Sequence, residues 1–347
     1  MKFIKDEHYK ITLWILEILA TLGFIYLIVY FVNAYSNYEI LENVPYDFKK
    51  GGDNNYLSPN EKGDALGGVL NPIIGIVAIL VTYLAFYIQY IANRQVQNQF
   101  KIQQFESQFY EMLRIHKDNV NEMYLTSKDG ENFNGRYVLE SIYYELIFCF
   151  NTCRSIVEAN YKRQNHNESN LKTDKSILNF VYSIWFHGAQ YINNEKFDFL
   201  QVECFKKLKN LQNEKNLHED IKHQILKGNQ SRVAHYYRHL FQTVKFVANQ
   251  DEDFISYENK RKYLRILRAQ LSNYEQALLF FNWFSDFGYK WEEANNLGNK
   301  FFTDYRIIHN LYPALILKMF DLDAFKSDRK EKNRGNDSIF EYQDWGY

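Results

Sequence analysis

A polar stripe runs along residues 261–282, a segment whose hydrophobic period predicts one helix. The stripe consists of Arg261, Arg265, Arg268, Ser272 and Glu275. Arginine side chains at this spacing can bind a phosphate or a carboxylate, because the planar guanidinium offers paired donors. We therefore expect the stripe to bind a phosphate-bearing ligand or an acidic partner. The alternative is that Arg268 and Glu275 form ordinary ion pairs on the helix surface, which contribute little stability.

A second group of polar residues lies in the segment 231–239, again at helical spacing. At 100° per residue, Arg232, His235 and His239 fall on a face nearly opposite the apolar one. The two histidines have the i, i+4 spacing of metal ligands, but a metalloprotease requires Glu where this chain has Tyr236. We therefore predict no metal site here. A solvated or structural Arg/His face explains the same pattern.

The pair Arg232 and His239 resembles the Arg-x4–6-His motif of HEPN ribonucleases, which are helical and common in phage defence. The resemblance implies that the pair binds the phosphate of RNA and promotes attack by the 2′-hydroxyl. Those proteins usually have a polar residue after the arginine, whereas this chain has Val233. A membrane-tethered ribonuclease with RNA as its partner is therefore an alternative function.

Other catalytic signatures are absent from the sequence, including the phosphate-binding Gly-rich loops, Gly-x-Ser-x-Gly and Cys-x-x-Cys. The cysteines Cys149, Cys153 and Cys204 are too few for a disulfide scaffold or a structural zinc site. Lys and Arg number 41 against 42 Asp and Glu, which excludes a strongly basic protein that coats nucleic acid. We expect no cofactor and no metal, and prefer a non-enzymatic role.

Two apolar segments near the N-terminus are long enough to cross a membrane, which takes about 20 residues. The first covers residues 11–32 and the second residues 66–92. A cleaved signal peptide would have a shorter apolar region, of about 7–15 residues. The sequence therefore predicts two transmembrane helices, with residues 1–10 before the first and a loop at 33–65 between them.

Two features inside these spans are candidates for a membrane function. Glu17 is an acid within the first span, and such residues are often functional, although it can also be solvated or paired with Lys10. The second span carries a stripe of small residues, namely Gly75, Ala78, Thr82 and Ala85. Small residues let another helix approach closely. The stripe is therefore expected to seat the first helix, or else to form a subunit interface.

The charges that flank the spans indicate the orientation. Lys2, Lys5 and Lys10 precede the first span, Arg94 and Lys101 follow the second, and the loop between the spans is acidic. The positive-inside rule then predicts that both termini are cytoplasmic. We expect a protein of the bacterial inner (cell) membrane whose partner is the lipid bilayer.

The helical pattern of the second span continues without Gly or Pro until Gly130. We predict a stalk helix over 93–125, a cytoplasmic α-helical domain over 126–322 and a polar tail over 323–347. Gly and Pro are scarce and aromatic residues make up 18% of the chain, which favours an all-α fold with a large core. Within the domain, helices are predicted at 136–159, 175–192, 196–213, 218–226, 231–249, 257–286 and 303–321.

Four stretches of the sequence resemble the putative phage abortive infection (AbiC-like) family of bacterial proteins. They are Gly63–Pro72, Gln104–Met123, Ala234–Lys245 and Ile266–Leu279. The resemblance implies a role in antiphage defence, in which infection is sensed and the host is arrested or killed. The family supplies no agreed reaction, so no catalytic residues can be transferred from it.

Taken together, the residues predict a membrane effector. Its cytoplasmic helical domain would detect a phage-derived or host trigger, and the stalk would pass the change to membrane helices, in a homo-oligomer. The outcome would be disturbance of the membrane or arrest of growth. The alternatives are the tethered ribonuclease and a structural membrane scaffold.

Overall fold

A computed structural model describes residues 14–33 except 16, 27 and 31, then 59–162, 169–212, 214, 217, 219–295, 298–316, 334 and 337–341. The chain forms two compact units, one up to Gln104 and one from Phe105 onward. Helices dominate the described residues, and the strands there form one short hairpin. The predicted all-α class is therefore confirmed.

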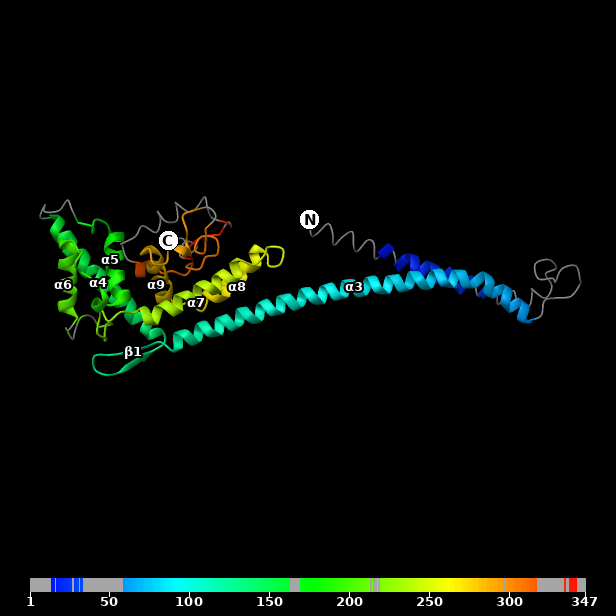
Figure 1. The fold of residues 1–347 in the computed structure, drawn as a ribbon, viewed down its shortest axis with the longest axis horizontal. Coiled ribbons are helices and arrows are strands. Elements are labelled where there is room, and N and C mark those ends of the chain that lie inside the picture. Colours follow the sequence, from blue (N-terminus) through cyan, green and yellow to red (C-terminus); the bar gives the residue numbers. More distant parts are fainter. Residues whose placement is uncertain are drawn as a thin grey trace, which may run out of the picture. The chain divides into compact units, whose positions relative to one another are not determined.

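The first unit is dominated by helix α3 (Pro59–Asn121), which contains Pro72 and continues past the end of this unit (Figure 1). Among the described residues it provides the one stretch long and apolar enough to cross a membrane, Asn71–Asn121, with a mean hydropathy of 2.0 in its most apolar window. None of that window is buried, and Ile79 is 70% exposed. No described part of the chain covers this apolar surface.

The predicted first span is only partly visible. An apolar helix covers Glu17–Tyr30, which is shorter than the roughly 20 residues that a bilayer requires, and several other residues of 11–32 lie outside the described part. The predicted topology of two spans is therefore not confirmed. Most of the expected loop at 33–65 also lies outside the described residues, and α3 already begins at Pro59.

The stripe of small residues on α3 was expected to seat the first helix or to form a subunit interface. Among the described residues, Val77 of α3 lies close to the apolar helix that contains Gly23, because a Cβ added at Gly23 would lie 3.7 Å from the Val77 side chain. The stripe residues Gly75, Ala78, Thr82 and Ala85 are exposed, and a Cβ added at Gly75 would meet nothing within 4 Å. Both interpretations of the stripe, a seat for the first helix and a subunit interface, stay predictions.

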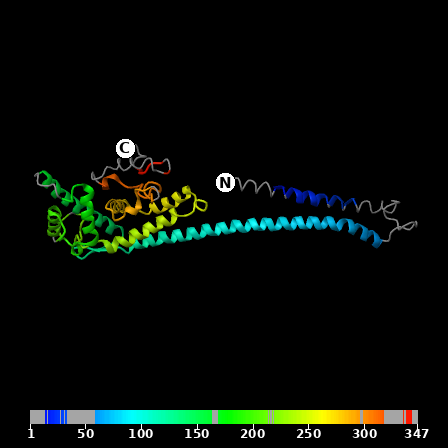
Figure 2. The ribbon, with the colours of Figure 1, turned by 45° about the horizontal axis from the view of Figure 1, so that its top comes forward.

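The second unit begins with the last turns of α3 and a hairpin of β1 (Tyr124–Thr126) and β2 (Asn132–Asn134), antiparallel with Leu125 opposite Phe133. The helices that follow are α4 (Arg136–Lys162), α5 (Asp174–His187), α6 (Phe199–Leu211), α7 (Gln230–Ala248), α8 (Tyr257–Arg268), α9 (Asn273–Phe284) and α10 (Pro313–Ile316), with 3-10 turns η1 (Ala189–Tyr191) and η2 (Tyr289–Trp291) (Figure 2). Helix α4 packs against α5, α6 and α9 and lies at the centre of the core.

The last turns of α3 belong to this core. Phe105 and Phe109 are buried, and the Phe105 ring lies 5.1 Å from Phe246 on α7 and 5.0 Å from Tyr263 on α8. The Tyr263 hydroxyl also donates a 2.6 Å hydrogen bond to Glu106. These contacts attach the end of α3 to α7 and α8 by aromatic packing.

Three predicted helices differ from the structure. The segment 257–286 is two helices, because Ser272 and Glu275 form a capping box that begins α9 after Leu271. The segment 218–226 is not helical in its described residues. The segment 303–321 consists mainly of turns followed by the four-residue α10, and its last residues lie outside the described part. The helices predicted at 136–159 and 231–249 are confirmed as α4 and α7.

Candidate functional site

The arginines predicted on the polar stripe form a cluster at α8. Arg261 holds the Asp337 carboxylate with both terminal nitrogens, one of them 2.6 Å from Oδ1. Arg306, which the sequence did not single out, is fully buried and places its Nη2 3.2 Å from the same oxygen. Arg268 donates to the Arg306 carbonyl at 3.0 Å. The structure thus brings three guanidinium groups to one place and sets a carboxylate among them.

A cavity of about 480 Å³ opens beside this cluster. Its polar lining is supplied by Arg265, Arg268, Asn273, Asn310, Tyr312 and Glu341. The Asn310 amide donates to the Glu341 carboxylate. Burial and the neighbouring Arg265 and Arg261 lower the pKa of Arg268 to about 10, whereas Arg261 lowers the pKa of Asp337 to about 2. Asp337 is therefore ionised at neutral pH and pairs with the arginines as a carboxylate.

The carboxylates of the cluster come from residues 337–341, within the expected polar tail. This segment is not loosely attached, because Ile339 and Phe340 are buried. The Glu341 amide donates to the His309 carbonyl at 2.7 Å, and the Ile339 carbonyl lies 2.9 Å from the His309 ring. We call residues 337–341 the acidic strap.

The last two residues of the predicted stripe lie elsewhere, because the helix breaks before them. Ser272 caps α9, and Glu275 is buried and accepts hydrogen bonds from the Ser272 amide at 2.5 Å and the Tyr236 hydroxyl at 3.2 Å. Arg136 approaches it at 3.8 Å. Burial raises the pKa of the Glu275 carboxyl. Glu275 therefore belongs to a separate buried cluster.

The three polar residues predicted on α7 have different surroundings. Arg232 donates to the Tyr124 carbonyl at 3.0 Å and to the Gly228 carbonyl at 3.2 Å, whereas His235 is exposed. His239 is partly buried, and its ring lies 6.4 Å from that of His116 on α3. These contacts do not test whether Arg232 and His239 take part in a reaction. The ribonuclease interpretation therefore stays a prediction.

His116 is the residue of this region that the sequence did not reveal. It is 2% exposed, neither ring nitrogen has a hydrogen-bond partner within the described part of the chain, and Glu275 lies 3.9 Å away. Burial, together with His239 and Arg136, lowers the pKa of His116 to about 4 from the usual 6.5. A histidine at a core position of an otherwise apolar helix face is the signal that could have found it.

We expect His116 to make the fold sensitive to acid. The unfolded chain binds this proton near pH 6.5 and the folded chain only near pH 4, so stability falls as the pH drops through that window. The loss should reach roughly 3 kcal/mol at about 1.4 kcal/mol per pKa unit. Urea denaturation of wild type and His116→Phe at several pH values measures it. The free energy of unfolding of the variant should lack this loss at low pH. The comparison separates His116 from Glu275, because the pKa of Glu275 shifts in the opposite direction. Parallel pH profiles of the two proteins would contradict the assignment to His116.

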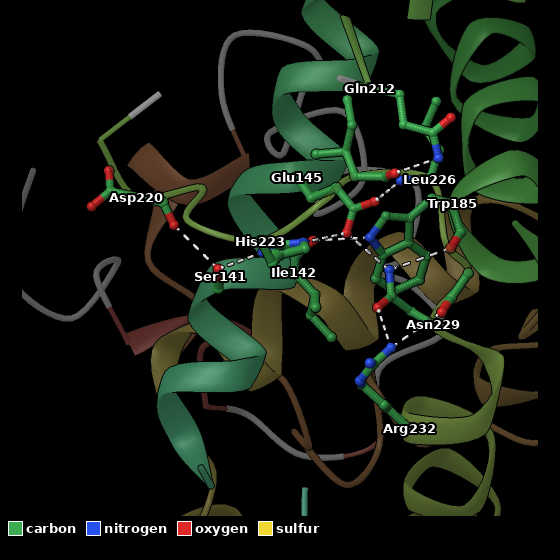
Figure 3. A network of polar contacts seen from close by, with 12 residues as sticks. Ser141, Ile142, Glu145, Trp185, Gln212, Asp220, His223, Leu226, Asn229 and Arg232 are labelled. Atoms are coloured by element: carbon green, nitrogen blue, oxygen red, sulfur yellow. Dashed lines mark hydrogen bonds and ion pairs between the residues drawn. The ribbon is translucent and has the colours of Figure 1, made fainter. Parts of the chain in front are cut away.

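A third polar cluster, which the sequence analysis did not single out, connects α4, α5 and α7 (Figure 3). Glu145 on α4 is 1% exposed and accepts hydrogen bonds from the Leu226 amide at 2.7 Å and the Asn229 amide group at 3.1 Å. Its Oε2 lies 2.9 Å from Nε2 of His223, and Nδ1 of His223 lies 3.0 Å from the Ser141 hydroxyl. Glu145 thereby fixes the segment that leads into α7.

The nearby backbone is equally constrained. The Asn229 amide donates to the Trp185 carbonyl at 3.0 Å, at the end of α5. Gly188 and Gly228 both have positive φ angles, 93° and 89°, and their backbones are in close contact. This junction positions the first turn of α7, including Arg232. Among the described residues, no group of His, Cys, Asp and Glu is arranged to hold a metal ion.

Comparison with known proteins yields one finding. Residues 228–314 match the family model described as Putative phage abortive infection protein. No curated protein and no solved structure matches the chain. The matched segment contains α7, α8 and α9, and thus Arg261, Arg265, Arg268 and Arg306 of the arginine cluster. The resemblance of this chain to the phage abortive infection family is therefore confirmed, over residues 228–314.

Proposed function

We propose that this protein is a membrane effector of antiphage defence, in which a cytoplasmic helical domain senses infection and acts on the cell membrane through α3. The family match supports the defence role. The observation that carries the membrane role is α3 itself. None of the described residues covers its apolar stretch, and the last turns of the same helix belong to the core of the second unit. Exposed apolar surface of this extent is costly in water and favourable in a bilayer.

The contacts at the end of α3 suggest how sensing reaches the membrane. Tyr263 on α8 packs on Phe105 and Phe109 and hydrogen-bonds to Glu106. A displacement of α8 would therefore act directly on α3. We infer that the trigger is a phage-derived or host molecule, that the protein acts as a homo-oligomer in the bacterial inner membrane, and that both termini are cytoplasmic. The outcome is disturbance of the membrane or arrest of growth.

Insertions into α3 between Asn98 and Gln99 test this coupling. Two alanines turn the following helix by about 200°, whereas seven helix-forming residues turn it by about 20° in total from its original phase. In phage-challenge assays with a membrane-potential dye, we expect the two-residue insertion to abolish protection and the seven-residue insertion to keep it. Seven Gly and Ser residues, matched in length, should also abolish protection because they interrupt the helix.

Three results would contradict the proposal. Protection by all three insertion variants would exclude transmission through α3. Recovery of the intact chain in the supernatant after high-speed centrifugation without detergent would exclude the membrane role. Protection that persists after the apolar stretch is replaced by a soluble oligomerisation helix would exclude the membrane as the target.

A further inference from the structure

We propose that the arginine cluster and its neighbouring cavity form a binding site for a nucleotide, and that the acidic strap occupies the phosphate position of this site in the unliganded protein. The inference deepens the sensing role proposed above, because it names the chemical class of the trigger and the contact that the trigger must replace.

The first argument is the balance of charge. Arg261, Arg265, Arg268 and Arg306 supply four guanidinium groups. Three carboxylates act on these groups in the described part of the chain: Asp337 and Glu341 of the strap act on Arg268, and Asp337 and Asp304 act on Arg306. Arg265 is exposed and forms no ion pair with any residue in the described ranges. A cluster with more cations than anions attracts an anionic ligand.

The second argument is the geometry around Asp337. Arg261 donates to its carboxylate with two nitrogens, and Arg306 contacts the same group at 3.2 Å. Two arginines can bind a phosphate with the same arrangement of donors. Arg306 is fully buried, yet its Nη1 has no hydrogen-bond partner in the part of the chain that the structure describes. A buried charged donor without a partner is unfavourable. A phosphoryl group has three terminal oxygens and can satisfy more donors than a carboxylate with two.

The third argument is the cavity. Arg268 joins the two parts of the site, because it lines the cavity and donates to the Arg306 carbonyl. The volume of about 480 Å³ suits a nucleotide-sized ligand. The amides of Asn273 and Asn310 can hydrogen-bond to the edge of a base, and the exposed ring of Tyr312 offers a surface for stacking.

The strap is placed to compete with such a ligand. The Asp337 side chain is 44% exposed, so an anion from solvent can reach its position. The Glu341 carboxylate lies in the cavity, where it accepts from Asn310. Binding of a nucleotide phosphate therefore requires the two carboxylates to leave, and the strap acts as an internal competitor.

Calorimetric titration of the detergent-solubilised full chain with ATP, AMP and inorganic phosphate tests this site. Asp337→Asn removes the competing charge and should tighten ATP binding by about tenfold or more. Glu341→Gln should act in the same direction and serves as a second variant if Asp337→Asn is poorly folded. Arg265→Met and Arg268→Met should each abolish or strongly weaken binding. Lys262→Met is the matched control, because Lys262 is exposed on the same helix and lines no part of the cavity.

The possible outcomes are separable. If ATP binds neither wild type nor the two strap variants at millimolar concentration, the site is excluded, and binding that survives Arg265→Met and Arg268→Met places the ligand elsewhere. Equal binding of inorganic phosphate and ATP would remove the nucleotide and leave a phosphate site, and binding of RNA alone would also overturn the inference. These measurements do not depend on protection against phage. The nucleotide site can therefore be disproved without disproving the membrane function, and the membrane function can be disproved without disproving the nucleotide site.

Discussion

Replacing Glu145 with alanine is expected to lower the free energy of unfolding by about 4 kcal/mol or more. The carboxylate is buried and accepts from the Leu226 amide, the Asn229 side chain and the His223 ring. Its removal leaves these three polar groups buried without their partner, at about 1–3 kcal/mol each. Glu145→Gln should cost less, because it keeps one acceptor oxygen for the Leu226 amide.

Urea denaturation followed by tryptophan fluorescence measures this effect, since Trp185 lies against the same junction (Figure 3). The matched control is Glu158→Ala on the same helix. Glu158 is exposed, and its i, i+4 partner Arg154 keeps a second ion pair with Asp174, so the loss of Glu158 should change stability by less than about 1 kcal/mol. If Glu145→Ala and Glu158→Ala had equal effects, the buried cluster would not fix the junction.

Gly228→Ala is the second substitution with a large expected effect, a loss of about 3 kcal/mol or more in unfolding free energy. An added Cβ would lie 2.6 Å from the His187 carbonyl oxygen and 2.9 Å from the Gly188 nitrogen, both backbone atoms that cannot rotate away. The φ angle of 89° adds strain of about 1–2 kcal/mol for any residue with a Cβ. The contact between α5 and the start of α7 would have to open.

Gly130→Ala separates the two contributions. Gly130 has nearly the same φ, 87°, but a Cβ there would meet nothing within 4 Å. It therefore reports the backbone strain alone, at about 1–2 kcal/mol. Thermal melting of the two variants should show a clearly lower midpoint for Gly228→Ala. Equal midpoints would mean that the junction adapts to the methyl group without cost.

The sequence predicts much of the fold because long amphipathic helices leave a strong periodic signal. The helices over 136–162 and 230–248 lie within a few residues of their predicted bounds. The prediction fails where distant contacts decide the conformation. The segment 218–226 reads as helical, but Glu145 holds its end through the Leu226 amide. The break before Ser272 could have been predicted, because Ser-x-x-Glu is a signature of a helix start. It was overlooked because the apolar period continues across the break.

In the candidate site too, local sequence patterns could be predicted and contacts between distant segments could not. The arginines of α8 can be singled out as candidates for binding an anion from their spacing alone. Their partner is not, because Asp337 follows Arg261 by 76 positions and lies in a segment of polar composition. Arg306 was missed because a single arginine in an apolar segment shows no spacing from which a site could be predicted. Glu145 stands between Tyr144 and Leu146 in an aromatic helix, and an acid at such a core position was the available clue.

Helix α8 is only 12 residues long, and this has a mechanical consequence. Arg261 binds Asp337 of the acidic strap, and Tyr263, two residues further on, packs against Phe105 at the end of α3. A helix of about three turns moves as a rigid body, so a shift of about 1–2 Å at one contact displaces the other contact by a similar distance. Under the function and the anion site proposed above, the protein then needs no extended relay of side chains, because one short helix contacts both the anion-binding residues and the helix proposed to cross the bilayer.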